Sequence, residues 1–259
     1  MNKPIVLIDL DDTLFQTHRR IKPEPHFKVA TVDKNQSPLS FMTSKQQAMV
    51  EWLGRSADLV PVTARSIEAL SRVKIDFNYG AICSHGGTIL NSDKEIDLEW
   101  FEIQKGHIES LNSMMGDLPD LLQTLAKDLG SIRTWAVEEN SLKIYTVAKQ
   151  NEPEQGLFLT DLVKMLPVEI KENFYVHTNG NNLAIIPNAI SKKNAVEFYL
   201  SKMDPHNERV VLGLGDSLSD FHFLTCCDWF GMPKNSQLHK FTDLSLQSDY
   251  AVRGFYGNV

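Results

Sequence analysis

Three carboxylates follow a short apolar run near the beginning of the chain. In IVLIDLDDTLF, residues 5–15, the acids Asp9, Asp11 and Asp12 stand close together. Carboxylates this close repel one another, and they are costly to bury unless a cation or a proton relieves the charge. The stretch therefore predicts a cationic partner or a bound proton at the end of a buried strand.

Other residues that could take part in chemistry follow similar apolar runs. Thr63 and Arg65 follow a second run, Asp216 and Asp220 follow a later one, and Lys192 begins a helical pattern. Each has an ordinary structural explanation, because Thr caps helices, surface Lys is solvated and Asp often follows Gly in a turn. In an open parallel sheet, however, ligands bind beyond the carboxyl ends of the strands. Their shared position at such ends indicates one site.

Strand-like and helix-like segments alternate along most of the chain. A helix capped by Ser44 is expected to continue to Leu53, and a second helical pattern covers residues 191–203. Residues 16–43 are expected to form an irregular flap beside the end of the first strand. Such alternation predicts an α/β fold with a doubly wound parallel sheet. The predicted strands cover residues 4–9, 58–63, 80–84, 209–216, 228–232 and 249–253.

One long interruption separates the two halves of this pattern. A helix is expected over about 104–129 and another near 155–166, and each precedes two strand-like runs joined by a turn, EEN in the first case and NGN in the second. The order helix, hairpin, helix, hairpin predicts an inserted α+β domain with an antiparallel sheet and two helices on one face. The predicted core is therefore residues 1–85 and 187–259, and the predicted insertion is residues 86–186.

Composition excludes several classes of protein. A chain of 259 residues with a net charge of -7 has no surplus of Lys and Arg for holding nucleic acid. No apolar run is long enough to span a membrane, and no signal peptide is recognisable. The three cysteines, Cys83, Cys226 and Cys227, contain no CxxC pair and suit the core of a protein in a reducing cytosol. We expect a cytoplasmic monomer or small homo-oligomer.

The motifs together resemble those of the haloacid dehalogenase-like superfamily of phosphatases. The resemblance spans the chain and includes the order of the motifs. The departures are TAR in place of the usual TGR, and His85 in SHGG where Asn is common. The insertion resembles the cap of the subgroup that includes sucrose-phosphate phosphatase, mannosyl-3-phosphoglycerate phosphatase and the Cof-type sugar phosphatases. The four motifs are matched by Asp9, Asp11 and Thr13; by Thr63; by Lys192, with Lys193 as the alternative; and by Gly215, Asp216 and Asp220.

This resemblance implies a Rossmann-like core that binds Mg2+. The Asp9 carboxylate, the Asp11 backbone carbonyl and Asp216 would ligate the ion, while Asp220 would ligate it directly or hold a water. Asp9 would attack the phosphorus atom and form an aspartyl-phosphate intermediate. Asp11 would protonate the leaving group and then activate the hydrolytic water.

The remaining motif residues would bind the phosphoryl group and the substrate. Thr63 and Lys192 would stabilise the phosphoryl oxygens. Arg65 would bind substrate or pair with a carboxylate, and His85 would bind substrate or be a hydrogen-bonded residue of a turn. Two motif residues are expected to shape the first loop, and four polar residues of the insertion either face the site or lie exposed in hairpins. They are Asp12 and Thr13 in the loop, and Lys143, His177, Asn181 and Asn182 in the insertion.

The resemblance therefore predicts a Mg2+-dependent phosphatase for a small phosphorylated metabolite, with a sugar phosphate as the expected substrate. Two alternatives stay open. A phosphomutase on a hexose phosphate would share the nucleophile, as the phosphomannomutases do. A non-catalytic binding module would share the fold without turnover.

Overall fold

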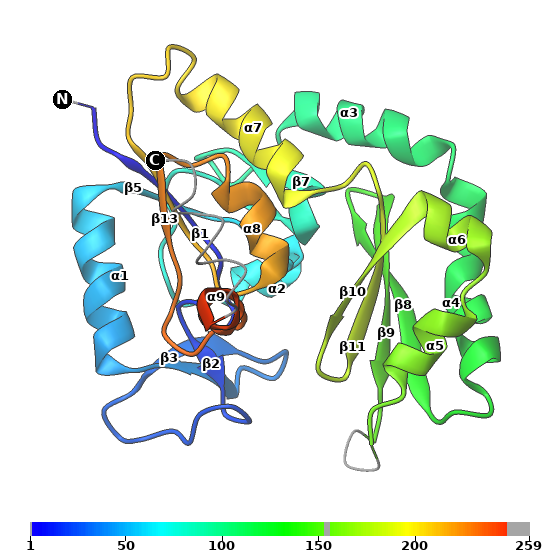
Figure 1. Ribbon diagram of the computed structural model, residues 1–259. Coiled ribbons are helices and arrows are strands. Elements are labelled where there is room, and N and C mark those ends of the chain that lie inside the picture. Colours follow the sequence, from blue (N-terminus) through cyan, green and yellow to red (C-terminus); the bar gives the residue numbers. More distant parts are fainter. Residues whose placement is uncertain (1, 153–155, 248–259) are drawn as a thin grey trace.

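The computed structural model describes residues 2–152 and 156–247. Figure 1 shows two parts, a parallel sheet with helices on the left and an antiparallel sheet with helices on the right. Below, the first part is called the core domain and the second the cap. The chain passes from the core domain to the cap and back once, as the sequence predicts.

The core domain is built on a parallel sheet. Its strands pair in the order β13 (Trp229–Gly231), β12 (Val211–Leu214), β1 (Ile5–Ile8) and β5 (Asp58–Pro61). A bridge from Val62 to Ile82 attaches β6 (Ala81–Cys83) beside β5. The predicted parallel sheet is confirmed, whereas the predicted strand at 249–253 lies outside the described residues.

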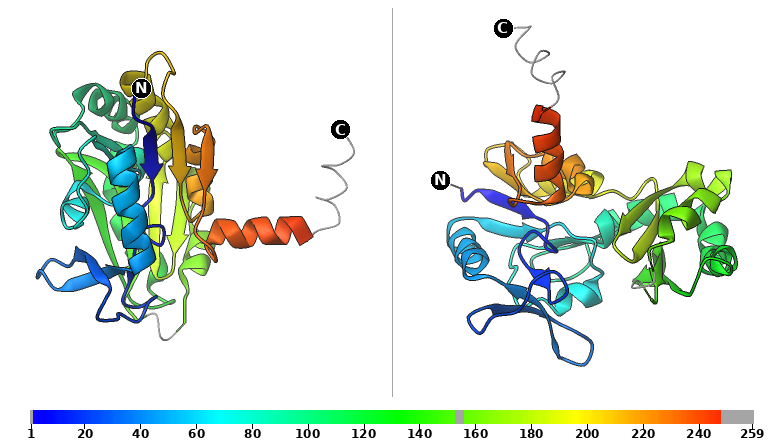
Figure 2. Two further views of the ribbon diagram at one scale, coloured as in Figure 1. Left: turned by 90° about the vertical axis from the view of Figure 1, so that its left-hand side faces the viewer. Right: turned by 60° about the horizontal axis from the view of Figure 1, so that its bottom comes forward.

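Both faces of this sheet are covered. Alternate residues of β1 contribute to two different hydrophobic clusters, one containing Ile5 with Phe223 and the other containing Val6 with Leu53. This is the doubly wound arrangement, because strands buried on both faces read as continuous apolar runs. The helices are α1 (Ser44–Ser56), α2 (Ile67–Ser71), α7 (Lys192–Met203), α8 (Leu218–Leu224) and α9 (Gln237–Gln247), and α9 projects from the core domain in Figure 2.

Two predictions for the first fifty residues are wrong. The cap residue of α1 is Thr43 and not Ser44, because Thr43 and Gln46 form a reciprocal capping box. Residues 16–42 are a three-stranded antiparallel sheet and not an irregular segment. Its strands pair in the order β2 (Gln16–Thr17), β4 (Pro38–Met42) and β3 (Lys28–Val32), and this small sheet is called the flap below.

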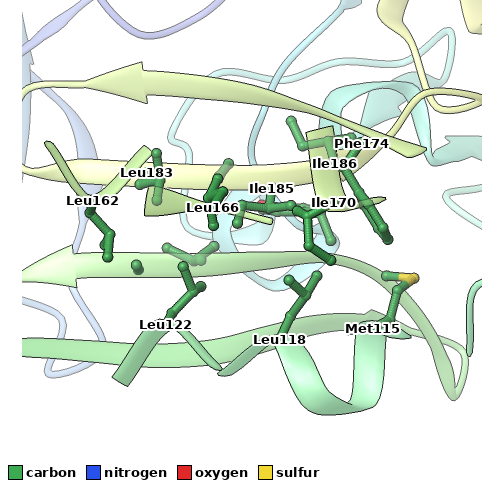
Figure 3. Close-up of a cluster of buried hydrophobic side chains, with 14 of the residues drawn as sticks. Met115, Leu118, Leu122, Leu162, Leu166, Ile170, Phe174, Leu183, Ile185 and Ile186 are labelled. Carbon is green, nitrogen blue, oxygen red and sulfur yellow. The ribbon is translucent and has the colours of Figure 1, made fainter. Parts of the chain in front are cut away.

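The cap is an antiparallel sheet with helices on one face. The strand order is β10 (Phe174–Asn179), β11 (Asn182–Pro187), β9 (Leu142–Gln150) and β8 (Ile132–Glu139). Its helices α4 (Asn112–Ala126), α5 (Leu159–Met165) and α6 (Val168–Asn173) lie on the face away from the core domain (Figure 1). Figure 3 shows the buried side chains between these helices and the sheet, among them Leu118, Leu122 and Ile185.

The first helix predicted in the insertion is divided in the structure, and the second is followed by a helix that the sequence does not predict. The first is α3 (Leu98–Glu109) followed by α4, because Trp100 of α3 packs in the core domain whereas Met115 of α4 packs in the cap. The second corresponds to α5, which ends at Met165 because Pro167 disfavours the helical conformation at Leu166, and α6 lies beyond the predicted range.

Packing also bears on where the cap begins. The strand β7 (Thr88–Leu90) pairs with β6, and Ile89 joins the same hydrophobic cluster as Trp100 and the core sheet. Ile108, near the end of α3, belongs to the cap cluster. The predicted boundaries of the cap, residues 86 and 186, stay a prediction. The packing of Trp100 in the core domain and of Ile108 in the cap favours a first boundary within α3.

Candidate active site

Three neighbouring strands of the core sheet end at the same place. The chain runs from β1 to β5 on one side and later to β12 on the other, so strand order reverses at β1. Asp9 follows β1, and its amide donates to the Leu214 carbonyl of β12 at 2.8 Å. Thr63 follows β5 and Asp216 follows β12, so both stand beside Asp9. This reversal point is where ligands bind in open α/β sheets.

A buried lysine connects two carboxylates at this edge. The Lys192 ammonium donates to Asp9 Oδ1 at 2.8 Å and to Asp220 Oδ1 at 2.6 Å. Thr13 donates to the other Asp9 oxygen at 3.2 Å. All four side chains are buried. The adjacent Lys193 is half exposed and faces Glu197 at 3.7 Å, so the structure places Lys192 in the charge cluster and Lys193 outside it.

The sequence of α7 explains how Lys192 reaches this position. Ser191 accepts a hydrogen bond from the Asn194 amide and so begins the helix immediately before Lys192. Ala195 and Val196 pack into the hydrophobic cluster and fix the face that the helix presents. Burial alone would lower the pKa of Lys192, but the carboxylates of Asp220 and Asp9 outweigh burial and raise it. Lys192 is therefore a permanent cation in the site.

Asp220 organises the loop after β12. Its Oδ2 atom accepts bonds from the Asp216 amide at 3.2 Å, the Ser217 amide at 3.0 Å and the Ser217 hydroxyl at 2.7 Å. Burial favours a raised pKa, but Lys192 and Ser217 hold the pKa of Asp220 below its ordinary value. A Cβ on Gly215 would come within 2.7 Å of the Asp220 Cβ. The glycine of the GDxxxD pattern is therefore what lets this carboxylate fold beneath the loop.

The acidic cluster is short of positive charge. Asp9, Asp216 and Asp220 each offer an oxygen, and these atoms lie within 4.8 Å of one another. Burial, then the Asp220 carboxylate, raises the pKa of Asp216 to about 7, and the same two causes raise the pKa of Asp9 well above its usual range. One ammonium does not offset three carboxylates. A hard cation with oxygen ligands such as Mg2+ fits this donor set.

The carboxylate of Asp11 points away from this cluster. Both of its oxygens accept from Arg65, at 2.7 Å from Nε and 2.7 Å from Nη2. Arg65 also donates to the Ala69 carbonyl at 3.3 Å. Of the two interpretations of Arg65, the structure shows the ion pair. This pairing is bidentate and therefore orients Asp11 firmly.

The two remaining residues of the first loop have local partners. Asp12 adopts a φ of 63°, its amide donates to the Phe15 carbonyl at 2.8 Å, and its carboxylate pairs with Arg20 at 2.6 Å. Thr13 bonds to Asp9. Both residues therefore shape the loop, as predicted.

Thr63 and His85 are neighbours, because the His85 amide donates to the Thr63 carbonyl at 3.1 Å. Thr63 is buried, and its hydroxyl accepts from the Arg65 amide at 3.1 Å. His85 is part of a short turn, η1 (Ser84–Gly86), with a φ of 61°. Its ring lies 5.0 Å from the Tyr145 ring and 5.5 Å from the His177 ring. Burial first, then His177 and Lys192, lowers the pKa of His85, so the imidazole is neutral.

A cavity of about 610 Å³ separates the core domain from the cap. Asp11, Arg65 and His85 line one side of it. Asp9, Thr63 and Lys192 do not line it in the described part of the chain; they lie buried beneath. Among the polar cap residues that the sequence singles out, His177, Asn181 and Asn182 line the cavity. Lys143 does not, since its ammonium lies near Gly116 of α4.

Glu139 and Tyr145 of the cap form hydrogen bonds to the core domain, and the sequence does not reveal these contacts. The buried carboxylate of Glu139 accepts from the Ser84 hydroxyl at 2.7 Å and from the Ile67 amide at 2.9 Å. The Tyr145 hydroxyl donates to the Ala64 carbonyl at 3.1 Å. The available signal is alternation along β9, which places Tyr145, Val147 and Lys149 on one face and in the cavity wall.

Solved structures share this arrangement over nearly the whole chain. The sucrose-phosphatase of Synechocystis, solved with sucrose and phosphate, is 16% identical, with 95% of this chain and 98% of that chain covered and a TM-score of 0.55. The C-terminal domain of C. albicans trehalose-6-phosphate phosphatase is 17% identical over 86% and 73% of the two chains, with a TM-score of 0.57. A haloacid dehalogenase-like hydrolase from B. subtilis is 12% identical over 95% and 93%, with a TM-score of 0.52.

The chain has the haloacid dehalogenase-like fold with an inserted cap. No family model and no curated protein sequence matches it. The haloacid dehalogenase-like fold and the α+β insertion predicted from the sequence are thus confirmed by structure. Across the residues that the structure describes, no helix combines the length and apolar character needed to cross a bilayer.

Proposed function

We propose that the protein is a Mg2+-dependent phosphatase that acts on a small phosphorylated metabolite, with sugar phosphates as its substrate class. The observation that carries this proposal is the Asp9 carboxylate. It is buried at the reversal point of the sheet, bonded to Lys192, and grouped with Asp216 and Asp220. A nucleophile, a cation site and a permanent positive charge thus meet at one point.

Asp9 and Asp216 are the proposed side-chain ligands of the ion, together with the backbone carbonyl of Asp11. Asp220 would hold a metal-bound water and would not ligate the ion directly. Its two oxygens are already engaged by Lys192, Ser217 and the Asp216 amide. When bound, Mg2+ neutralises the carboxylates and the charge of the phosphoryl oxygens.

Asp9 is the proposed nucleophile, and its attack on phosphorus would form an aspartyl phosphate. Lys192 supports this step because its ammonium can pass from Asp9 Oδ1 to the phosphoryl oxygens. Thr63, at the end of the adjacent strand, would donate its hydroxyl to the same group. The first product is the alcohol of the metabolite.

Asp11 is the proposed acid and base. It would protonate the departing oxygen in the first step and accept a proton from water in the second. The bidentate pair with Arg65 engages both carboxylate oxygens, so one of them has to be released before Asp11 can act. Arg65 then gains a free donor at the cavity, where it can bind the substrate. Arg65 would thus pair with Asp11 before the reaction and bind the substrate during it.

The closed arrangement explains why the cap has to move. Asp9 lies beneath the cavity lining, and the contacts from Glu139 and Tyr145 hold the cap against the core domain. Opening these contacts would admit the phosphate, and closing them would exclude water. Cap packing begins at Ile108 of α3 and ends at Ile190, whereas Trp100 and Ala195 pack in the core domain. We therefore place the hinge within α3 and at the connection that leads from Ile190 into α7.

Sugar recognition is supported by the neutral polar groups of the cavity. The imidazoles of His85 and His177 have lowered pKa values and can exchange hydrogen bonds with hydroxyl groups. Asn181, Asn182 and the ring of Trp135 complete a wall suited to a polar ligand. Sucrose and phosphate bound in the Synechocystis structure are consistent with this substrate class.

The test measures free phosphate released from a panel of sugar phosphates in the presence of Mg2+. We expect release from at least one sugar phosphate with the wild-type protein and a loss of at least about 1,000-fold with Asp9→Asn. Asp33→Asn, in a turn of the flap, is the control and should not change the rate. Isomerised sugar phosphate without free phosphate would favour a phosphomutase, and no turnover of any ester would favour a binding module.

A further inference from the structure

The cavity contains two cations that the proposed reaction does not use. Its lining includes two acids, Asp11 and Asp12, and these pair with Arg65 and Arg20 respectively. Arg19 of the core domain and Lys149 of the cap also line the cavity. Neither has an acidic partner within the described ranges 2–152 and 156–247. The cavity therefore holds two surplus positive charges.

The surroundings of Lys149 make this surplus of positive charge more unfavourable. In the register of the cap sheet, Lys149 of β9 lies directly opposite Arg133 of β8. Like charges opposite each other destabilise an antiparallel pair. Burial first, then Arg19 and Arg133, lowers the pKa of Lys149. Lys149 therefore has two cationic neighbours, Arg19 and Arg133, although the chain as a whole has a net charge of -7.

The position of this cluster distinguishes it from the phosphate site. Tyr145 marks the near end of the cavity, because its hydroxyl bonds to Ala64, next to Thr63. Lys149 is four residues further along the same strand, which corresponds to about 13 Å between their backbones at the usual rise. A ligand whose phosphate reaches Asp9 can therefore extend a second group toward Lys149.

We propose that Arg19 and Lys149 bind a second anionic group of the substrate, a carboxylate or a second phosphate. This inference rests on the proposed phosphatase function and narrows its substrate class to sugar phosphates with two acidic groups. Arg19 belongs to the core domain and Lys149 to the cap, so the anion would bridge the two. It would replace repulsion across the cavity by two attractive contacts and so favour the closed cap.

The test compares three esters in the presence of Mg2+. Glucose 6-phosphate lacks a second acid, 6-phosphogluconate has a carboxylate, and fructose 1,6-bisphosphate has a second phosphate. For the wild-type protein we expect kcat/KM to be at least about tenfold higher for one or both of the doubly acidic esters. The doubly acidic ester with the higher kcat/KM shows whether the second anionic group is a carboxylate or a phosphate. Equal kcat/KM values for all three esters would overturn the inference.

The variants Lys149→Gln and Arg19→Gln assign the effect to residues. Each is expected to lower the ratio of kcat/KM for the doubly acidic ester to that for glucose 6-phosphate by about tenfold. The matched control is Arg133→Gln, since Arg133 neighbours Lys149 but does not line the cavity within the described residues. Its ratio should stay within about threefold of wild type. An unchanged ratio in both Lys149→Gln and Arg19→Gln would contradict the assignment.

A binding measurement separates this inference from the proposed function. If none of the three esters releases phosphate, the proposed function fails, but titration calorimetry with gluconate and glucose still tests the cations. Gluconate is expected to bind at least about tenfold more tightly than glucose, and Lys149→Gln should remove the difference. Equal binding of gluconate and glucose by the wild-type protein would reject the anion site.

Discussion

The floor of the site, formed by the buried residues Asp9, Lys192 and Asp220, differs in its arrangement of charge from the wall that the cap contributes to the cavity. In the floor, Asp9 and Asp220 are buried and both accept hydrogen bonds from the buried Lys192. In the wall, Lys149 lies next to other cations, and His177 has a lowered pKa. A floor whose charged side chains are held in place by hydrogen bonds is preorganised for one reaction. A wall that presents a cation and neutral polar groups to the cavity is suited to selecting a ligand.

This contrast assigns chemistry to the core domain and substrate choice to the cap. Changes in the floor should therefore affect every substrate, whereas changes in the wall should affect some substrates more than others.

Removal of the metal should abolish activity toward every ester. The carboxylates of Asp9, Asp216 and Asp220 repel one another without a cation, and burial together with the Asp220 charge raises the pKa values of Asp9 and Asp216. Activity is expected to vanish with EDTA and to return with Mg2+. Calcium should restore little, because its larger and looser coordination shell would misplace Asp9. Undiminished turnover in metal-free protein would exclude this mechanism.

Asp11→Asn should distinguish esters by their leaving groups. A sugar alkoxide needs a proton as it departs, so we expect a loss of roughly 100-fold to 10,000-fold with a sugar phosphate. A nitrophenolate leaves without that proton, so phosphoenzyme formation from p-nitrophenyl phosphate should be affected much less. The phosphoenzyme should then accumulate, because Asp11 also activates the water. Rapid-quench measurements of burst and steady-state rates test both expectations.

The matched control for this experiment is Asp12→Asn. Asp12 adopts a positive φ that Asn also tolerates, and its carboxylate pairs with Arg20. Asp12→Asn should therefore change the rates with the two esters by the same factor. Equal losses for both esters with Asp11→Asn, and no burst, would show that Asp11 is not the acid and base.

Lys192→Met should reduce the free energy of unfolding in metal-free protein. The change removes the ammonium and leaves the carboxylates of Asp9 and Asp220 buried without their cation, a loss of about 3–5 kcal/mol. Mg2+ should restore part of this loss, because the ion binds the native state beside the same carboxylates. Urea denaturation with and without Mg2+ provides the measurement.

Lys193→Met is the control, since that side chain is half exposed and pairs only loosely with Glu197. It should change the unfolding free energy by no more than about 0.5 kcal/mol. Similar losses for the two lysines would show that the floor is not stabilised by the Lys192 charge.

Sequence spacing alone groups the floor residues, whereas for the wall it offers only His177, Asn181 and Asn182 as candidates. Asp9, Thr63 and Asp216 follow apolar strands directly, and parallel strands bring their carboxyl ends to one edge, so local spacing is enough. The role of Lys149 depends on the strand register and on how the cap docks. Glu139 gives no local signal either, because its partners Ser84 and Ile67 are distant in the chain. Neither docking nor the division of α3 from α4 follows from periodicity alone.

Tyr145→Phe should have the smallest effect and should act through the cap. It removes the hydroxyl that bonds to the Ala64 carbonyl but keeps the ring against His85. One such bond contributes about 0.5–1.5 kcal/mol, so the closed cap should be disfavoured by roughly 2-fold to 10-fold. We expect this factor in the KM of a sugar phosphate, which contacts the cap, and little change with p-nitrophenyl phosphate. Tyr175→Phe is the control, because Tyr175 lies in the same sheet and its hydroxyl has no hydrogen-bond partner among the described residues. An equal change for both esters with Tyr145→Phe would mean that the contact serves the floor as well, and the division between chemistry and selection would fail at this residue.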